Sequence, residues 1–129
     1  MYKYLLLACL LITSCSAYSQ SDCKNFRIGK FQNVENGVIK SKITRSDSLQ
    51  IEEYGNVKVT LKIEWIDDCT YRLIFKEGNE SFWASRPKDR PTPDLIVRIT
   101  KTEKDSYLQE AKFVGDNDFQ YKSNMVKVK

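Results

Sequence analysis

Residues 57–65 form the segment that most restricts what this chain can fold into. Every odd position in the segment is apolar and every even position is polar. Successive side chains of a β-strand point to opposite sides, so this period of two predicts a strand with one buried face and one solvated face. Such a strand needs partner strands and a core on its apolar side, and the segment therefore predicts a β-sheet domain.

Shorter segments of the same character lie on both sides of it, separated by turn residues. Asn36-Gly37 is typical of a two-residue hairpin loop of type I′, and Gly55-Asn56 is typical of type II′. Residues 77–93 contain three prolines and predict a long loop, with a short strand possible at 81–84. No segment predicts an amphipathic helix. Strands are expected at 24–34, 38–45, 49–54, 57–65, 69–75, 95–99, 106–114 and 119–128.

This pattern predicts an all-β fold, a small antiparallel up-and-down barrel of seven or eight strands, with a sandwich as the alternative. Most of the expected connections are short, as an up-and-down path requires. Closure of the barrel also removes the exposed strand edges that promote aggregation.

Alternation along the strands predicts which side chains enter the barrel. Nearly all of them are bulky, and side chains just fill the interior of an eight-stranded barrel. The sequence therefore predicts a mostly filled core, with at most a shallow cavity near one mouth. The residues expected to face inward are Phe26, Phe31, Ile51, Val57, Val59, Leu61, Ile63, Trp65, Tyr71, Leu73, Phe75, Val97, Ile99, Phe113 and Phe119.

Residues 1–19 predict a signal peptide for export. Lys3 provides a positive charge, and the apolar run 5–12 has the length of a signal peptide but is too short to span a bilayer. Small residues before position 20 predict cleavage there, which leaves residues 20–129 as a single barrel domain. The expected location is the periplasm, the outer membrane or the cell exterior.

A second ending of the signal is also consistent with the sequence. Residues 12–15 resemble the bacterial lipobox, in which the cysteine is lipidated and becomes the mature N-terminus. In that case Cys15 carries lipid, and the domain is attached to a membrane through this anchor alone.

Cys23 and Cys69 are the two cysteines that follow the signal segment. An even pair in an exported chain predicts a disulfide. A bridge that closes so long a loop stabilises by about 4 kcal/mol in the chain-entropy model. The chain has no CxxC motif and no histidine, so its sequence does not favour a redox or metal pair.

Composition argues against several classes of function. The 21 basic and 17 acidic residues are mixed along the chain, which does not indicate the clustered basic face of a nucleic-acid-binding protein. Without histidine there is no Ser-His-Asp or Cys-His site. Glu52-Glu53 would point to opposite faces of a strand, while Asp67-Asp68 and residues 116–118 are typical of turns. The sequence therefore predicts no enzyme, no metal and no cofactor.

Phe82, Trp83 and Arg86 form a candidate binding loop. Aromatic rings beside arginine are typical of recognition surfaces, and proline stiffens this segment. The alternative is that one ring caps the barrel and the charges keep the loop soluble.

Two arginines, Arg45 and Arg72, lie within expected strands. We expect them to face solvent or to pair with Glu52 or Glu64 on neighbouring strands. The alternative is that either one enters the barrel and holds an anionic group.

Six segments carry a resemblance to known proteins: 23–31, 43–46, 50–52, 63–65, 68–73 and 119–128. Together they resemble a group of small exported proteins from flavobacteria and related Bacteroidetes, whose function is not established. Some of these proteins bear a DNA topoisomerase label, but this chain has no room for an ATPase or strand-cleavage domain. Gly29-Lys30-Phe31 is also similar to the Gly-x-Trp start of lipocalins, with Phe31 in place of Trp, which implies a lipocalin- or calycin-like barrel.

Together these features predict an exported, non-enzymatic binding protein. Its partner would be a small apolar ligand in the barrel or a surface polymer at the candidate binding loop. The alternative is a structural or protein-interaction module, such as an envelope lipoprotein that contacts another envelope protein or an inhibitor. Nucleic acid is not an expected partner.

Overall fold

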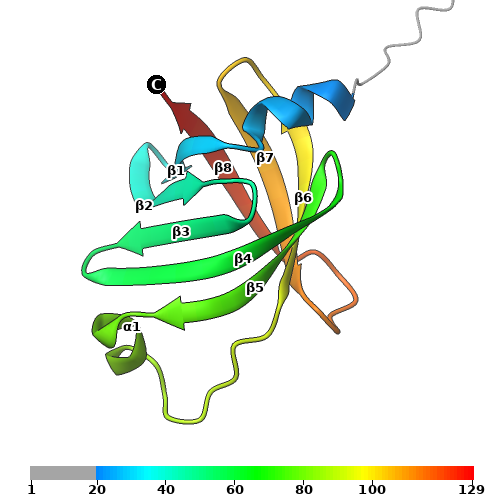
Figure 1. Cartoon of the computed structure of the whole chain (residues 1–129). Coiled ribbons are helices and arrows are strands. Elements are labelled where there is room, and N and C mark those ends of the chain that lie inside the picture. Colours follow the sequence, from blue (N-terminus) through cyan, green and yellow to red (C-terminus); the bar gives the residue numbers. More distant parts are fainter. Residues whose placement is uncertain (1–19) are drawn as a thin grey trace, which may run out of the picture.

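The computed structural model describes residues 20–129, and these form a closed antiparallel barrel of eight strands (Figure 1). Each strand pairs with the next, and the last pairs with the first, so the predicted up-and-down barrel is confirmed and the sandwich is wrong. The predicted signal segment and Cys15 lie outside the described residues. The strands are β1 (Gly29–Glu35), β2 (Val38–Arg45), β3 (Leu49–Tyr54), β4 (Val57–Asp67), β5 (Thr70–Gly78), β6 (Leu95–Thr102), β7 (Ser106–Phe113) and β8 (Tyr121–Val128).

Both predicted two-residue turns close hairpins of the barrel. Asn36 and Gly37 have φ of 51° and 76°, the two positive values that a type I′ turn requires. In the turn between β3 and β4 only the first residue, Gly55, has positive φ, as type II′ requires. These turns set the register of the β1–β2 and β3–β4 pairs from local sequence.

The N-terminal segment differs from the prediction. A strand was expected from residue 24, but a 3₁₀ helix, η1 (Gln20–Phe26), precedes β1 and lies at one end of the barrel (Figure 1). Phe26 is only 1% exposed and packs against Phe31 and Tyr107. It therefore reaches the core from a cap over the barrel end. We call this the closed end.

A short helix, α1 (Glu80–Ala84), stands where a short strand was considered at 81–84, and that prediction is wrong. Asn79 caps it, since its Oδ1 accepts a hydrogen bond from the Phe82 N–H at 3.0 Å. The Nδ2 of Asn79 also donates to the carbonyl of Asn56 at 2.8 Å, which ties α1 to the β3–β4 turn. Helix α1 and the loop after it lie at the opposite end of the barrel from η1, which we call the mouth (Figure 1).

The disulfide is confirmed, with Cys23 and Cys69 joined Sγ to Sγ at 2.00 Å. It links η1 to the turn between β4 and β5, and Cys23 is buried in the core of the closed end. The bridge therefore holds the cap on the barrel. None of the helices in residues 20–129 is long and apolar enough to cross a membrane.

Most of the residues expected inside the barrel are there. The strongest agreement is on β4, β5 and β6, where alternate apolar side chains are buried. Trp65 is partly buried and its ring packs against Tyr71 at a centroid distance of 4.7 Å. The confirmed buried residues are Phe26, Phe31, Val59, Ile63, Tyr71, Leu73, Val97 and Ile99.

Two of the residues expected inside are not there. Phe119 lies before β8, and its ring is covered by the Arg98 guanidinium at 4.0 Å and the Lys112 ammonium at 5.1 Å. Ile51 lies opposite Thr60 on β4, whereas its neighbours Gln50 and Glu52 pair with inward residues of that strand. On β3, therefore, Gln50 and Glu52 face the interior, whereas Leu49 and Ile51 face out.

Candidate functional site

Arg45 lies at the centre of the barrel and is 2% exposed, so the expectation that it faces solvent is wrong. Its three nitrogens donate four hydrogen bonds, and each acceptor belongs to a different element of the fold. Nε donates to Gln50 Oε1 at 2.9 Å and Nη1 to the Phe26 carbonyl at 2.7 Å. Nη2 donates to the hydroxyls of Tyr71 and Tyr107, both at 3.0 Å. One guanidinium thus joins η1, β3, β5 and β7.

The surroundings of Arg45 keep it charged. Burial lowers the pKa of Arg45, but the oxygens of Tyr71 and Tyr107 and the carboxyl of Glu52 more than offset this, and the pKa stays above its usual value. Burial raises the pKa of Tyr71 well above its usual value, so its hydroxyl remains protonated and donates to Gln109 Oε1 at 3.2 Å. The network is therefore built around a fixed positive charge on Arg45.

Gln50 connects this charge to Glu52. Its Oε1 accepts from Arg45, and its Nε2 donates to Glu52 Oε1 at 2.8 Å. Burial raises the pKa of Glu52, and the Gln50 hydrogen bond and the Arg45 charge reverse this only in part. We call Arg45, Gln50 and Glu52 the interior relay. It runs from the packed core of the closed end to the wall of a cavity.

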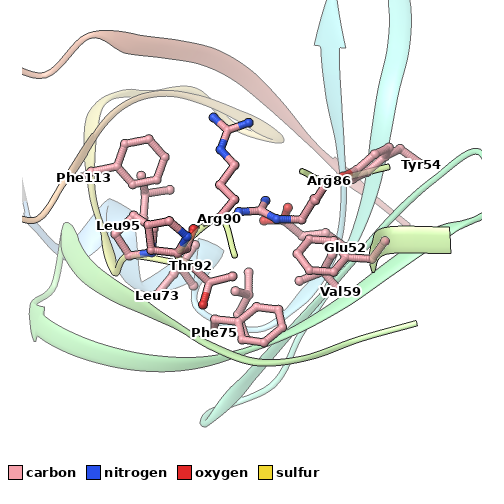
Figure 2. A pocket seen from close by; sticks show the side chains of 14 residues that line it. Glu52, Tyr54, Val59, Leu73, Phe75, Arg86, Arg90, Thr92, Leu95 and Phe113 are labelled. Atoms are coloured by element: carbon pink, nitrogen blue, oxygen red, sulfur yellow. Dashed lines mark hydrogen bonds between the residues drawn. The ribbon is translucent and has the colours of Figure 1, made fainter. Parts of the chain in front are cut away.

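The cavity occupies the half of the barrel nearer the mouth and has a volume of about 470 Å³ (Figure 2). The sequence predicts at most a shallow cavity near one mouth. The position agrees, and the volume falls in the range of small-molecule sites. Its polar side chains are few and include Glu52 from β3 and Arg86 and Arg90 from the loop after α1. Its apolar wall is formed by Val59, Leu61, Leu73, Phe75, Phe82, Leu95 and Phe113.

Two of the three candidate loop residues line this cavity. Phe82 is buried and stacks on Phe75 at 5.4 Å between ring centroids. Arg86 covers the ring of Phe82 at 4.9 Å and donates to the Pro91 carbonyl at 2.9 Å. Trp83 is 51% exposed and does not belong to the lining. The loop thus both caps the barrel and supplies the mouth with cations.

The end of β5 is shaped to admit the ring of Phe82. A Cβ atom at Gly78 would lie 2.2 Å from Phe82 Cδ1, closer than two carbon atoms approach. A glycine at this position is therefore needed for Phe82 to close one side of the cavity.

Sequence reasoning did not assign Glu52 and Arg90 to the site. The signal for Glu52 was its place two residues from Gln50 on one face of a short strand, which was interpreted as the solvated face. Arg90 lies four residues beyond Arg86 in the same proline-containing loop, and no sequence pattern distinguishes it from the other loop cation, Lys88. Arg72, the other strand arginine, lies on the outside as expected, but its Nε donates to Asp94 Oδ2 at 2.8 Å rather than to Glu64.

Among residues 20–129, no group of three His, Cys, Asp or Glu side chains is placed to hold a metal ion. No family model, no curated protein and no solved structure matches this chain. The case for the site therefore depends on its own geometry.

The raised pKa of Glu52 has a consequence for stability. A carboxyl group with a raised pKa in the folded state favours folding at acid pH, and this contribution is lost as pH rises through the folded pKa. Glu52→Gln, which keeps the shape without the charge, should therefore raise the free energy of unfolding at pH 7 relative to wild type. The gain should shrink as pH falls below the usual glutamate range.

The measurement is urea unfolding of both proteins at pH 7 and pH 4. Glu53→Gln is the matched control, because Glu53 lies next to Glu52 on the same strand and its side chain is exposed. If Glu52→Gln is less stable than wild type at pH 7, the attraction between Arg45 and the Glu52 carboxylate outweighs the cost of burying that carboxylate.

Proposed function

We propose that this protein is an exported, non-enzymatic binding protein that takes a small, mainly apolar ligand into the barrel cavity. The observation that carries the proposal is the cavity of about 470 Å³ with an apolar wall and few polar groups. Ligand sites commonly have this composition, with apolar contacts for affinity and a few polar groups for orientation. The fold supports it, since eight-stranded barrels of the lipocalin type hold one small ligand.

The disulfide supports the exported location. Such bonds form and persist in oxidising compartments and are rare in the cytosol, and this one joins the only two cysteines within residues 20–129. The proposed location is the periplasm, the outer membrane or the cell exterior.

The cavity chemistry supports binding rather than catalysis. General acid–base catalysis uses side chains that change protonation near the working pH. Within the lining, Glu52 is the one acidic side chain, and no histidine or cysteine accompanies it as a partner acid or base.

The proposal predicts saturable uptake of a neutral apolar fluorophore such as N-phenylnaphthylamine by the folded protein. Leu95→Trp should fill the cavity and weaken uptake by about tenfold or more, since a ligand that loses apolar contacts loses at least 1.4 kcal/mol. Ile96→Trp is the matched control, because the next residue on β6 points away from the interior.

Fluorescence titration of wild type and both variants decides the matter, with circular dichroism to show that each is folded. No saturable uptake by well-folded wild type, or equal weakening by both substitutions, would refute the proposal.

The alternative is a protein-interaction module, such as an envelope lipoprotein or an inhibitor, or a binder of surface polymer. It is favoured by Trp83, which is 51% exposed beside the mouth, because tryptophan is enriched among the residues that carry interface energy. Trp83 lies outside the cavity lining. Trp83→Ser should therefore leave fluorophore uptake intact, and loss of a purified partner's binding in that variant would favour the alternative.

A further inference from the structure

The polar groups of the cavity differ in depth. Along β3, the side chain of Gln50 is buried, that of Glu52 is partly exposed, and that of Tyr54 is exposed at the rim. Two strand residues span about 7 Å, so Glu52 lies roughly that far below the rim. Arg86 and Arg90 come from the loop at the mouth (Figure 2). The Glu52 carboxylate therefore lies below the rim, whereas the two arginines belong to the loop at the mouth, where Arg90 is exposed and Arg86 is partly buried.

The charges at the two depths are balanced differently. The deep carboxylate of Glu52 is linked through Gln50 to the buried charge of Arg45, so the interior relay is close to neutral as a whole. At the mouth, neither Arg86 nor Arg90 forms an ion pair with a carboxylate of residues 20–129. Within the described residues, both arginines of the lining thus lack an acidic partner at ion-pair distance.

Arg86 and Glu52 can each form hydrogen bonds beyond those they form within the described residues. The Nε of Arg86 is buried and has no partner within the described residues. Leaving a buried donor unpaired costs free energy that a bound acceptor would recover. The carboxylate of Glu52 accepts one hydrogen bond, from Gln50, whereas its two oxygens have about four acceptor sites.

We propose that the ligand is an amphipathic organic acid that enters tail first. Its anionic group stays at the mouth with Arg86 and Arg90, its apolar body fills the chamber, and a hydroxyl at its far end donates to Glu52. This inference depends on the proposed function.

Charge balance favours this orientation over the reverse. An ammonium group beside Glu52 would add a second positive charge near Arg45, which Glu52 already compensates. A hydroxyl satisfies the same acceptor sites without adding charge. At the mouth, an anion neutralises cations that have no acidic partner, and arginine binds carboxylates through paired N–H donors.

Displacement of N-phenylnaphthylamine from the folded protein tests the inference with four ligands of one chain length. These are octanol, octanoate, octylamine and 8-hydroxyoctanoate, whose chain length suits the depth of Glu52 below the rim. Octanoate should bind about tenfold more tightly than octanol, the effect of one charge-assisted hydrogen bond. 8-Hydroxyoctanoate should bind more tightly than octanoate, and octylamine should bind most weakly.

Substitutions test which residues cause each difference in affinity among the four ligands. The double variant Arg86→Gln/Arg90→Gln should lower the ratio of octanoate to octanol affinity to about one. Lys88→Gln is the control, since Lys88 is an exposed cation of the same loop outside the lining. Glu52→Gln should reduce the advantage of the ω-hydroxyl group, because a neutral acceptor binds more weakly than a carboxylate. Glu53→Gln should leave the advantage of the ω-hydroxyl group unchanged.

The outcomes separate the two proposals. Equal affinities for octanol and octanoate, or strongest binding of octylamine, would overturn the inference and leave a neutral or cationic ligand for the same cavity. An ω-hydroxyl advantage unchanged in Glu52→Gln would overturn the orientation. Failure of the fluorophore itself to bind wild type would instead refute the proposed function.

Discussion

Arg45→Leu is expected to lower the free energy of unfolding by about 3–5 kcal/mol, the usual effect of breaking a buried charged network from one side. The substitution removes four hydrogen bonds at once. It leaves the Phe26 carbonyl and two tyrosine hydroxyls without their donor, and each buried unpaired group costs about 1–3 kcal/mol. It also leaves the partly buried carboxylate of Glu52 without its compensating charge.

Urea unfolding measures the effect, and two further variants locate its origin. Arg45→Lys keeps the charge but not the planar fork of donors, so it should recover only part of the loss. In the double variant Arg45→Leu/Glu52→Gln the stranded carboxylate is gone, so the loss should be smaller than in Arg45→Leu alone. If Arg45→Leu costs less than about 1 kcal/mol, the relay is not a major source of stability.

The double substitution Cys23→Ala/Cys69→Ala is expected to lower the free energy of unfolding by about 4 kcal/mol. The bridge spans a sequence separation of 46, and the unfolded chain gains the freedom of that loop when it is removed. For a domain of this size, such a loss is expected to lower the melting temperature by about 15 °C. The loss is a large share of the roughly 5–15 kcal/mol that stabilises a typical domain.

Calorimetry of wild type, the double alanine variant and wild type under reductant measures this loss. Because the bridge holds η1 on the closed end, amide exchange in residues 22–26 should also become faster, while the β4–β5 ladder keeps its protection. A melting temperature that reductant and the double substitution leave unchanged would show that the core alone holds the cap.

The barrel itself is predictable from local sequence. The period of two in residues 57–65 places Val59 and Ile63 inside, and the turn residues at 36–37 and 55–56 define two hairpins. These signals are local, because alternation follows from strand geometry and the turns follow from the φ values that glycine and asparagine tolerate. Short connections then leave few ways to close eight strands.

The capping elements were less predictable. Helix α1 has five residues, too few for a helical period to show, and its signal was the single capping side chain of Asn79. The apolar residues of η1 resemble the start of a strand, and the disulfide and Phe26 hold the segment as a cap instead. In both cases tertiary contacts outweigh weak local preference.

The candidate site depends most on what only the tertiary structure decides. The sequence by itself determined the all-β class, the cysteine pair and an apolar barrel interior, because those follow from alternation and residue type. It did not determine which face of β3 is inside, since Leu49 and Ile51 suggest one face and the barrel buries the other. That choice follows from the partner strands and from Arg45, whose buried charge requires acceptors drawn from several distant segments. Polarity along one strand cannot show such a requirement, because it arises only when the barrel closes.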